Sequence, residues 1–453
     1  MKTIIMAGGR GTRLAEHTER LPKPLVPVAG IPILERELAV LRSQGFTDIL
    51  ITVSYLGSAI RNYFGDGSKC SPVTGEPFGV QIEYFEEQEP LGNAGALLKL
   101  RPRLQEPFLL LNADVLFDVD LRRFLAFHQE HSCLATLLTH PNSHPYDSGL
   151  IVASEGGRVR QWLAKEDDRP PYYSNRVNAG LHIISPEALD KAGIDASLVG
   201  TVDSVTGKKI KVDLDRQILK PLAGTGLLYC YDSPEYVKDM GTPERLTQAD
   251  LDCRNGLVAA RNLSRPQKAV FLDRDGTLIR FAGYVHRPED FELLPKVAEA
   301  VRRLNEAGWL CIVATNQPVV ARGELSLEGL RLIHQKLETE LGQQGAYVDA
   351  IYACTHHPDK GFPGEVSELK FDCSCRKPKP GMLLVAAERY NIDLTVSWMI
   401  GDSWRDMECG LAAGTHTCLL TGDGTEPQNK ESRPELICAD LWEAVDKILQ
   451  EGE

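Results

Sequence analysis

Short apolar runs alternate with longer amphipathic stretches through residues 1–245. Each run has the length of a buried strand, whereas the stretch 33–43 places Leu34, Leu38 and Leu41 at helical spacing. Alternation of strands and helices is typical of a mostly parallel sheet that is covered by helices on both faces. We expect strands at residues 2–6, 48–53, 108–111, 135–139, 180–184 and 227–231.

This alternation is interrupted once and then resumes. Residues 245–261 have a helical pattern, and the segment 262–267 is polar and contains a proline, which indicates a linker. A new apolar strand follows at 269–272, and further buried strands are expected at 311–314 and 398–400. The sequence therefore predicts two doubly wound, Rossmann-like α/β domains. We place them at residues 1–245 and 268–453, with a linker at 246–267.

Composition narrows the classes of partner. The formal net charge of −13 argues against nonspecific binding to nucleic acid or to an anionic membrane surface, because both need a basic footprint. Met1 to Gly9 has the pattern of a strand entering a glycine loop rather than of a signal peptide, and no apolar stretch approaches the ~20 residues that span a bilayer. Most of the 11 cysteines are scattered singly, as reduced thiols are, so we expect a cytoplasmic protein. The oligomeric state is left open.

A glycine-rich loop follows the first strand. Its backbone N–H groups can approach phosphates closely, although its spacing is neither that of a dinucleotide-binding motif nor that of a P-loop. Two nearby cations suit a triphosphate, whose charge must be neutralised during transfer. The candidate nucleotide-binding residues of this region are Gly8, Gly9, Gly11 and Thr12, and the candidate catalytic cations are Arg13 and Lys23.

Two aspartates follow later strands of the first domain. Asp114 comes at the carboxyl end of the strand at 108–111, where open α/β sheets place their ligands, and Asp239 follows a later strand. Two carboxylates that share one Mg²⁺ with substrate phosphates are a usual arrangement for this cation. We therefore expect Asp114 and Asp239 to bind magnesium.

Residues 1–245 resemble the sugar-1-phosphate nucleotidyltransferase family. The resemblance implies that a sugar 1-phosphate attacks the α-phosphorus of a nucleoside triphosphate and releases pyrophosphate, with Arg13 and Lys23 on the phosphates. It also implies that Gly92 and Asn93 lie beside the base, and that Asn178 and Gly180 lie beside the sugar. The matching segments are Gly8–Leu14, Pro22–Pro24, Glu89–Leu97, Leu110–Asp114, Val177–Leu181 and Asp239–Pro243.

Two features depart from this family pattern. Members usually carry Glu-Lys before the Asn-Ala-Gly segment, with the lysine on the sugar phosphate, whereas this chain has Lys165-Glu166. The stretch Cys70–Pro77 reads as an insertion, to which we assign no role.

The second domain opens with a pair of carboxylates after a strand. Asp273 and Asp275 stand at alternate positions, so one can attack phosphorus while the other protonates the leaving oxygen. Carboxylates would repel a phosphate dianion without a cation, so we expect Mg²⁺ at Asp273, Asp275 and Asp402. Thr315 can hydrogen-bond the transferring phosphoryl group, and Lys377 can neutralise it.

Residues 268–453 are similar to the haloacid-dehalogenase-like phosphatases. The ordered motifs Asp273–Leu278, Thr315, Lys377 and Gly401-Asp402 carry this resemblance. It implies that Asp273 is the nucleophile, that Asp275 is the general acid and base, and that Asp402 and the backbone carbonyl of Asp275 complete the metal shell. In such an arrangement Asp406 more often lies outside the metal's direct ligands.

Three cysteines and a histidine stand close together in the second domain. Cys354, His356, Cys373 and Cys375 offer three thiolates and an imidazole, a tetrahedral set that suits structural Zn²⁺. The stretch between them is rich in glycine, proline and charge, so the metal would hold its shape. We do not expect His357 to be a ligand, because His356 has the better spacing.

The zinc loop leads directly into Arg376 and Lys377, which would place two cations at the mouth of the phosphatase. A loop of this kind resembles those of heptose 1,7-bisphosphate phosphatases and histidinol-phosphate phosphatases. Gly283–His286 and Thr315-Asn316-Gln317 also occur in that subgroup, which makes Thr315 and Asn316 candidate substrate-binding residues. Pro318-Val319 replaces the usual Ser-Gly.

The presence of both domains on one chain favours the heptose relative, because a heptose bisphosphate phosphatase makes the 1-phosphate that a nucleotidyltransferase would activate. We expect removal of the 7-phosphate of D-glycero-D-manno-heptose 1,7-bisphosphate and transfer of GMP from GTP, giving GDP-heptose for surface glycans. GTP rests on family association alone. Two alternatives stay open: a hexose-1-phosphate nucleotidyltransferase fused to a histidinol-phosphate-type phosphatase, and a regulatory protein with inactive domains.

Overall fold

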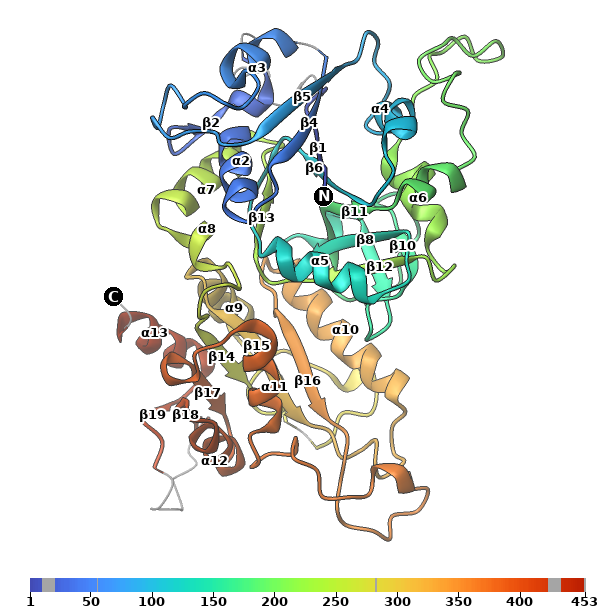
Figure 1. The fold of residues 1–453 in the computed structure, drawn as a ribbon. Coiled ribbons are helices and arrows are strands. Elements are labelled where there is room, and N and C mark those ends of the chain that lie inside the picture. Colours follow the sequence, from blue (N-terminus) through green and yellow to red (C-terminus); the bar gives the residue numbers. More distant parts are fainter. Residues whose placement is uncertain (10–20, 55, 282, 423–432, 452–453) are drawn as a thin grey trace. The chain divides into compact units, whose positions relative to one another are not determined.

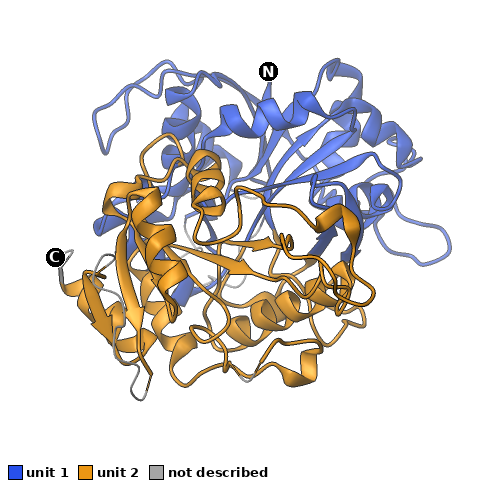
Figure 2. Ribbon diagram, turned by 90° about the horizontal axis from the view of Figure 1, so that it is seen from below, with its two compact units in different colours: residues 1–140, 151–162, 178–262 blue, residues 141–150, 163–177, 263–453 orange. Residues whose placement is uncertain are grey.

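The chain folds into two compact units (Figure 1 and Figure 2). The structure, a computed structural model, describes residues 1–453 except 10–20, 55, 282, 423–432 and 452–453. Unit 1 comprises residues 1–140, 151–162 and 178–262. Unit 2 comprises residues 141–150, 163–177 and 263–453.

A nine-stranded sheet forms the centre of unit 1. Its main path runs β10-β9-β11-β6-β1-β4-β5, and β8 pairs with both β11 and β12. The pairs β1–β4, β1–β6, β4–β5 and β8–β12 are parallel, whereas β11 is antiparallel to β6. The strands are β1 (Thr3–Met6), β4 (Asp48–Val53), β5 (Gln81–Glu86), β6 (Phe108–Asn112), β8 (Ala135–His140), β9 (Leu150–Ala153), β10 (Val159–Leu163), β11 (Val177–Ile184) and β12 (Leu228–Asp232).

Alternate strand residues of unit 1 enter two separate cores, because successive side chains of a strand point to opposite faces. Ile5 packs with α2, α3 and α5, whereas its neighbour Ile4 packs with α4 and α6. The sheet is therefore buried on both faces. The helices are α2 (Ile33–Ser43), α3 (Gly57–Phe64), α4 (Gly95–Leu100), α5 (Leu121–Glu130), α6 (Pro186–Lys191), α7 (Pro243–Arg254) and α8 (Leu257–Ala260). Two small two-stranded sheets complete unit 1. One pairs β2 (Pro27–Val28) with β3 (Ile31–Pro32), and the other pairs β7 (Val115–Asp118) with β13 (Tyr236–Asp239).

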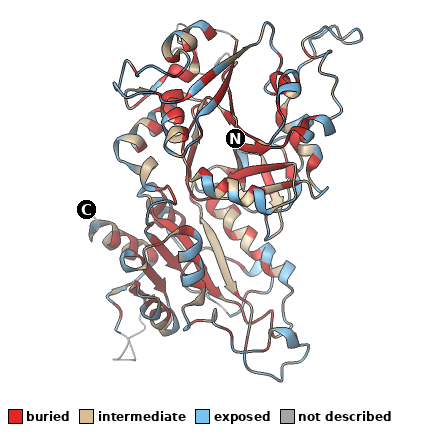
Figure 3. Ribbon diagram, in the orientation of Figure 1, coloured by how far each residue is buried: buried red, intermediate tan, exposed pale blue. Residues whose placement is uncertain are grey.

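Unit 2 is built on a six-stranded sheet of order β16-β15-β14-β17-β18-β19, and every neighbouring pair is parallel. Its central strands are buried (Figure 3), with α9, α10 and α13 packed on one core and α11 on the other. The strands are β14 (Ala269–Leu272), β15 (Leu310–Asn316), β16 (Ala350–Cys354), β17 (Trp398–Gly401), β18 (His416–Leu420) and β19 (Leu436–Cys438). The helices are α9 (Val297–Glu306), α10 (Leu327–Gln343), α11 (Gly381–Tyr390), α12 (Trp404–Ala413) and α13 (Leu441–Glu451).

Two segments from early in the chain belong to unit 2. Residues 163–177 pack on α10, where the Tyr173 N–H donates to Thr339 Oγ1 at 2.9 Å and the Asn175 N–H donates to Glu338 Oε1 at 3.1 Å. Residues 141–150 reach the same helix, because Pro145 lies against Gly342. Periodicity did not indicate this, since neither segment carries an amphipathic pattern.

The two doubly wound α/β folds expected from the sequence are confirmed. Most expected strands differ from the observed ones by a residue or two, although β11 begins three residues before 180–184 and β15 extends past 311–314 at both ends. Residues 243–260, which overlap the expected linker at 246–267, form α7 and α8 within unit 1, where Leu246 and Ala249 pack against Val26 and Val28. None of the described helices is long and apolar enough to cross a membrane.

Replacing Leu38 by alanine tests the core of unit 1. Leu38 is 1% exposed on α2, so Leu38→Ala should lower the free energy of unfolding of unit 1 by about 2–5 kcal/mol. Calorimetry of the full chain should show one transition moved down and the other unchanged. Leu251→Ala, on the exposed face of α7 (48% exposed), is the matched control and should cost less than about 1 kcal/mol. Equal effects of both variants would contradict this packing.

Candidate active sites

Three parallel strands of unit 2 bring polar residues together at their carboxyl ends. Asp273 follows β14, Thr315 lies near the end of β15, and Asp402 follows β17. They line one cavity of about 240 Å³. The sequence motifs therefore meet in space as the parallel order of the strands predicts.

A buried lysine lies beside the carboxylates of this cavity. Lys377 is 3% exposed, and its Nζ lies 2.9 Å from Asp273 Oδ1 and 2.6 Å from Asp406 Oδ1. Burial lowers the pKa of Lys377, but Asp273 and Asp406 outweigh it and raise the pKa above its usual value, so the side chain stays charged. Asn316 fixes the lysine backbone, donating to its carbonyl and accepting from its N–H at 3.0 Å each.

Three carboxylates gather beside that lysine. Oxygen atoms of Asp273, Asp402 and Asp406 lie within 4.8 Å of one another. Loss of water around the Asp402 carboxyl, together with Asp273 and Asp406, raises its pKa to about 7, although part of the residue reaches solvent. Three carboxylates at this separation repel one another, and a hard divalent cation such as Mg²⁺ is the partner that oxygen ligands of this kind suit. Asp406 also closes a capping box on α12 by accepting from Ser403.

Asp275 is held apart from this carboxylate group. Arg274, which is fully buried, donates to both oxygens of Asp275 at 2.9 Å, and Gln317 Nε2 donates to Oδ2 at 2.7 Å. Gln317 also donates to Thr315 Oγ1 at 2.9 Å. Arg274 and Gln317 were missed as site residues, although an arginine between two aspartates could have been weighed as their partner.

The mouth of the cavity combines aromatic and basic side chains. Phe281, Tyr284 and Pro318 line it together with Arg376 and Arg405. At the position where the related phosphatases usually carry Ser-Gly, Pro318 forms part of the wall, and the following Val319 is fully buried against Leu330. Arg405 was not predicted as a site residue.

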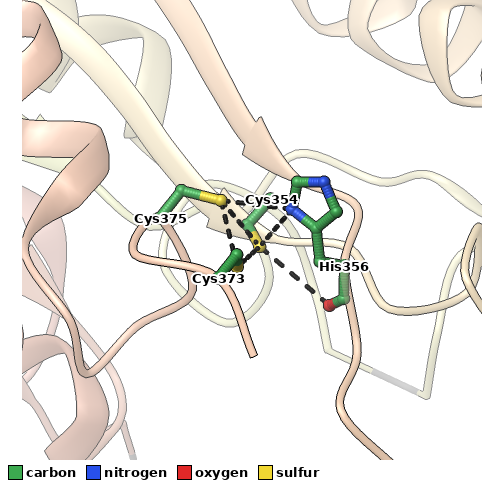
Figure 4. A group of neighbouring side chains, drawn as sticks. All are labelled: Cys354, His356, Cys373 and Cys375. Atoms are coloured by element: carbon green, nitrogen blue, oxygen red, sulfur yellow. Dashed lines mark hydrogen bonds between the residues drawn. The ribbon is translucent and has the colours of Figure 1, made fainter. Parts of the chain in front are cut away.

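A second group of candidate ligands lies where β16 ends (Figure 4). The Sγ atoms of Cys354, Cys373 and Cys375 are 3.2–3.5 Å apart, and His356 Nδ1 is 3.3 Å from Cys375 Sγ. These four atoms all lie within 4.8 Å of one another, as the ligands of a single metal ion do. His357 stands outside this group and accepts from the Asp359 N–H at 3.2 Å.

Unit 1 presents its expected site residues at the ends of β1, β6 and β13. Gly8 and Gly9 follow β1, whereas Gly11, Thr12 and Arg13 lie outside the described residues. Ser54 Oγ, after β4, donates to the Gly8 carbonyl at 2.6 Å, and a Cβ on Gly8 would come within 2.9 Å of Glu87 Oε1. A larger residue at position 8 would therefore require the Glu87 side chain to shift.

The two aspartates of unit 1 are brought together by their backbones, since the Met240 N–H, next to Asp239, donates to the Asp114 carbonyl at 2.8 Å. Each carboxylate has a cation as partner: Asp114 pairs with Lys23, and Asp239 pairs with Arg245 at 2.5 Å. Metal binding would have to compete with both pairs.

The residues expected beside base and sugar also have structural partners. Gly92 has φ +87°, and a Cβ there would overlap the carbonyl of Val212. Asn93 Oδ1 accepts from the Leu214 N–H at 2.8 Å, which ties its loop to the segment after Val212. Asn178 Oδ1 lies 3.1 Å from His182 Nε2 and accepts from the Gly180 N–H at 3.3 Å.

Lys165 and the insertion at 70–77 have partners away from these residues. Lys165 forms an ion pair with Asp147 in unit 2. The insertion is a hairpin bridged between Cys70 and Pro77, and Thr74 Oγ1 donates to Glu35 Oε1 at 3.0 Å.

These arrangements define the class of protein. A charged lysine and clustered carboxylates at the strand ends of a parallel sheet suit phosphoryl transfer in unit 2, and the glycine loop with its aspartates suits a nucleotide in unit 1.

Comparison with known proteins agrees with this assignment. A family model described as nucleotidyl transferase matches residues 2–254, and one described as HAD-hydrolase-like matches residues 374–444. The D-glycero-D-manno-heptose-1,7-bisphosphate 7-phosphatase of Thermosynechococcus vestitus is 41% identical over 191 residues, covering 40% of this chain and 96% of that protein. The D-glycero-beta-D-manno-heptose-1,7-bisphosphate 7-phosphatase of Yersinia pestis is 42% identical over 181 residues, covering 39% and 94%.

Among solved structures, HddC from Yersinia pseudotuberculosis aligns with a TM-score of 0.44 and 21% identity, covering 56% of this chain and 99% of that one. The chain therefore belongs to the nucleotidyl transferase family through its N-terminal region and to the family of these curated phosphatases through its C-terminal region, and it is a two-activity enzyme.

Gly276 offers a direct test of the phosphatase cavity. It has φ +85°, and a Cβ there would overlap the Asp402 carboxylate. Gly276→Ala should therefore lower phosphatase activity by at least about 100-fold while nucleotidyltransferase activity stays intact, because moving Asp402 disturbs the carboxylate group. Gly414→Ala is the control: its φ of +84° imposes the same backbone strain, but nothing lies within 4 Å. Equal activity losses in the two variants would show that backbone strain, rather than the Asp402 clash, is responsible.

Proposed function

We propose that the chain carries out two successive steps in the synthesis of a nucleotide-activated heptose. Unit 2 removes the 7-phosphate of D-glycero-D-manno-heptose 1,7-bisphosphate, and unit 1 transfers GMP from GTP to the resulting heptose 1-phosphate. The main support for this proposal is that a region 41% identical to a heptose bisphosphate phosphatase shares one chain with a nucleotidyltransferase region. The product of the first reaction is the kind of substrate that the second family takes.

In the phosphatase step, Asp273 attacks the 7-phosphorus, so that an aspartyl–phosphate bond forms as the bond to the sugar oxygen breaks. Asp275 gives its proton to that leaving oxygen and then takes a proton from the water that hydrolyses the intermediate, which releases inorganic phosphate and regenerates Asp273. Lys377 stays beside Asp273 and neutralises the phosphoryl oxygens. Arg274 and Gln317 hold Asp275 in place. Bound at Asp273, Asp402 and the Asp275 carbonyl, Mg²⁺ would offset the charge of substrate and carboxylates.

In the transferase step, an oxygen of the heptose 1-phosphate attacks the α-phosphorus of GTP, and pyrophosphate leaves. Lys23 and Arg13 neutralise the phosphates, while Gly8, Gly9, Gly11 and Thr12 give their backbone N–H groups to them. Asp114 and Asp239 would hold Mg²⁺, with Lys23 and Arg245 released from these carboxylates.

We also propose that Cys354, His356, Cys373 and Cys375 bind one structural Zn²⁺. Three thiols and an imidazole nitrogen within 4.8 Å match the donor set and spacing that tetrahedral zinc requires. The bound ion would fix the loop that ends in Arg376 and Lys377, so it would shape the phosphatase mouth without joining the chemistry.

Product release tests the proposed pair of reactions. With Mg²⁺ and heptose 1,7-bisphosphate, inorganic phosphate should form in every reaction and pyrophosphate only with GTP among the nucleoside triphosphates. Asp273→Asn should abolish phosphate release, yet keep pyrophosphate release from heptose 1-phosphate and GTP. Phosphate from histidinol phosphate instead of the heptose would overturn the phosphatase assignment. If pyrophosphate formed only with another nucleoside triphosphate, or only with another sugar 1-phosphate, the transferase assignment would be overturned.

Zinc content tests the metal centre. The wild-type protein should hold about one zinc per chain by plasma mass spectrometry, and Cys373→Ser should hold much less because a ligand is lost. The variant should also lose phosphatase activity and keep nucleotidyltransferase activity. Cys311→Ser, a buried thiol of β15 outside the cluster, should keep its zinc. Full zinc content in Cys373→Ser would refute the site.

A further inference from the structure

A buried histidine of β11 contacts one of the residues expected beside the sugar. His182 is 1% exposed, and its Nε2 lies 3.1 Å from Asn178 Oδ1. Residues four positions apart on a regular strand are separated by about 13 Å. Gly180, between the two, has φ +80°, a backbone conformation that glycine adopts readily, and this irregularity lets the two side chains meet.

The contact fixes the direction of the Asn178 amide. The Gly180 N–H can only donate, so the atom that it reaches at 3.3 Å is the amide oxygen, Oδ1. Burial lowers the pKa of His182 to about 3, so the imidazole is uncharged at neutral pH and carries one N–H. That N–H is on Nε2, because Oδ1 can only accept. The N–H groups of Asn178 Nδ2 have no partner among the described residues, so they are available to a ligand.

His182 leaves a polar atom unsatisfied inside unit 1. Its other ring nitrogen, Nδ1, is buried and has no hydrogen-bond partner in the part of the chain that the structure describes. Burial of a polar atom without a partner destabilises a fold. Ile184, on the same face of β11, packs in an apolar core, and an apolar residue at position 182 would avoid the unsatisfied nitrogen. Stability alone therefore does not explain the histidine, whereas its Nε2–H is a donor that no apolar residue supplies.

Asn178 lies beside the strand end that carries Asp114. Gly180 approaches Asn112, the last residue of β6, so closely that a Cβ would come within 3.0 Å of Asn112 Nδ2. A sugar 1-phosphate has to reach this strand end if its phosphate is to meet a metal ion at Asp114. Its hydroxyl and phosphate oxygens accept hydrogen bonds, so they suit an amide that offers only N–H groups.

We propose that His182 is a positioning residue for sugar binding, which holds Asn178 Oδ1 so that the amide N–H groups face the bound sugar 1-phosphate and donate to its oxygens. His182 itself does not touch the substrate. This assignment rests on the proposed transferase function of unit 1. Loss of the Nε2–H therefore weakens binding of the sugar phosphate and leaves binding of the nucleotide unchanged.

Steady-state kinetics of pyrophosphate release, with each substrate varied in turn, test this assignment. His182→Leu has a similar volume and lacks the donor, so KM for heptose 1-phosphate should rise by about 5- to 30-fold as the Asn178 amide loses its fixed direction. KM for GTP should stay within about twofold of the wild-type value. His182→Gln can donate to the same oxygen and should bring KM for heptose 1-phosphate back to within about threefold of wild type.

A double-mutant cycle shows whether His182 acts through Asn178. Asn178→Ala should raise KM for heptose 1-phosphate by a similar factor, and adding His182→Leu should raise it by no more than about twofold further. His128→Leu is the matched control and should leave both KM values unchanged. His128 is a buried histidine of α5 whose Nδ1 contacts Thr136 Oγ1.

Independent effects that multiply in the double variant would overturn the proposal, as would equal rises of both KM values in His182→Leu. A wild-type protein that releases pyrophosphate only with another sugar 1-phosphate would instead overturn the proposed heptose substrate, and the cycle would then be measured with that sugar. The two failures are therefore distinguishable.

Discussion

The ammonium group of Lys377 is the interaction on which the organisation of unit 2 depends. It is almost completely removed from water, and a buried charge of this kind costs several kcal/mol unless it is paired. Asp273 and Asp406 provide the pairing: Asp273 follows β14, and Asp406 stands in the first turn of α12. Asn316 holds the lysine backbone from a third strand. Removing Lys377 would leave Asp273 and Asp406 facing each other without compensation, so the same ion pairs specify both the fold at this edge and the charge balance of the site.

The two units solve the problem of clustered carboxylates in different ways. In unit 2 three carboxylates lie beside one lysine, and burial of the Asp402 carboxyl together with the charges of Asp273 and Asp406 raises its pKa. In unit 1 each aspartate has its own cation, Lys23 for Asp114 and Arg245 for Asp239. Unit 2 is therefore prepared for a divalent ion before substrate arrives. In unit 1 a metal would have to displace existing ion pairs, and an incoming triphosphate can take over the released cations.

Local sequence signals located the central strands of both sheets and the candidate site residues that follow them, but they did not indicate β5, β9, β10, β16, β18 or β19. The strand ends that carry Asp273, Thr315 and Asp402 were recognisable because buried parallel strands read as short apolar runs and polar residues follow them directly. Arg274 and Arg405 were not found, because their roles depend on which side chain faces which after folding. The packing of residues 163–177 on α10 was not predicted either, because contacts between segments so distant in the chain leave no periodic pattern.

That packing has a consequence for the order in which the protein can assemble during synthesis. Residues 141–150 and 163–177 leave the ribosome before any part of α10 has been made, so Tyr173 and Asn175 must wait for Thr339 and Glu338. At ordinary elongation rates this interval lasts roughly 10 to 30 seconds. Unit 2 can therefore complete its packing only late in synthesis, although two of its segments are made early.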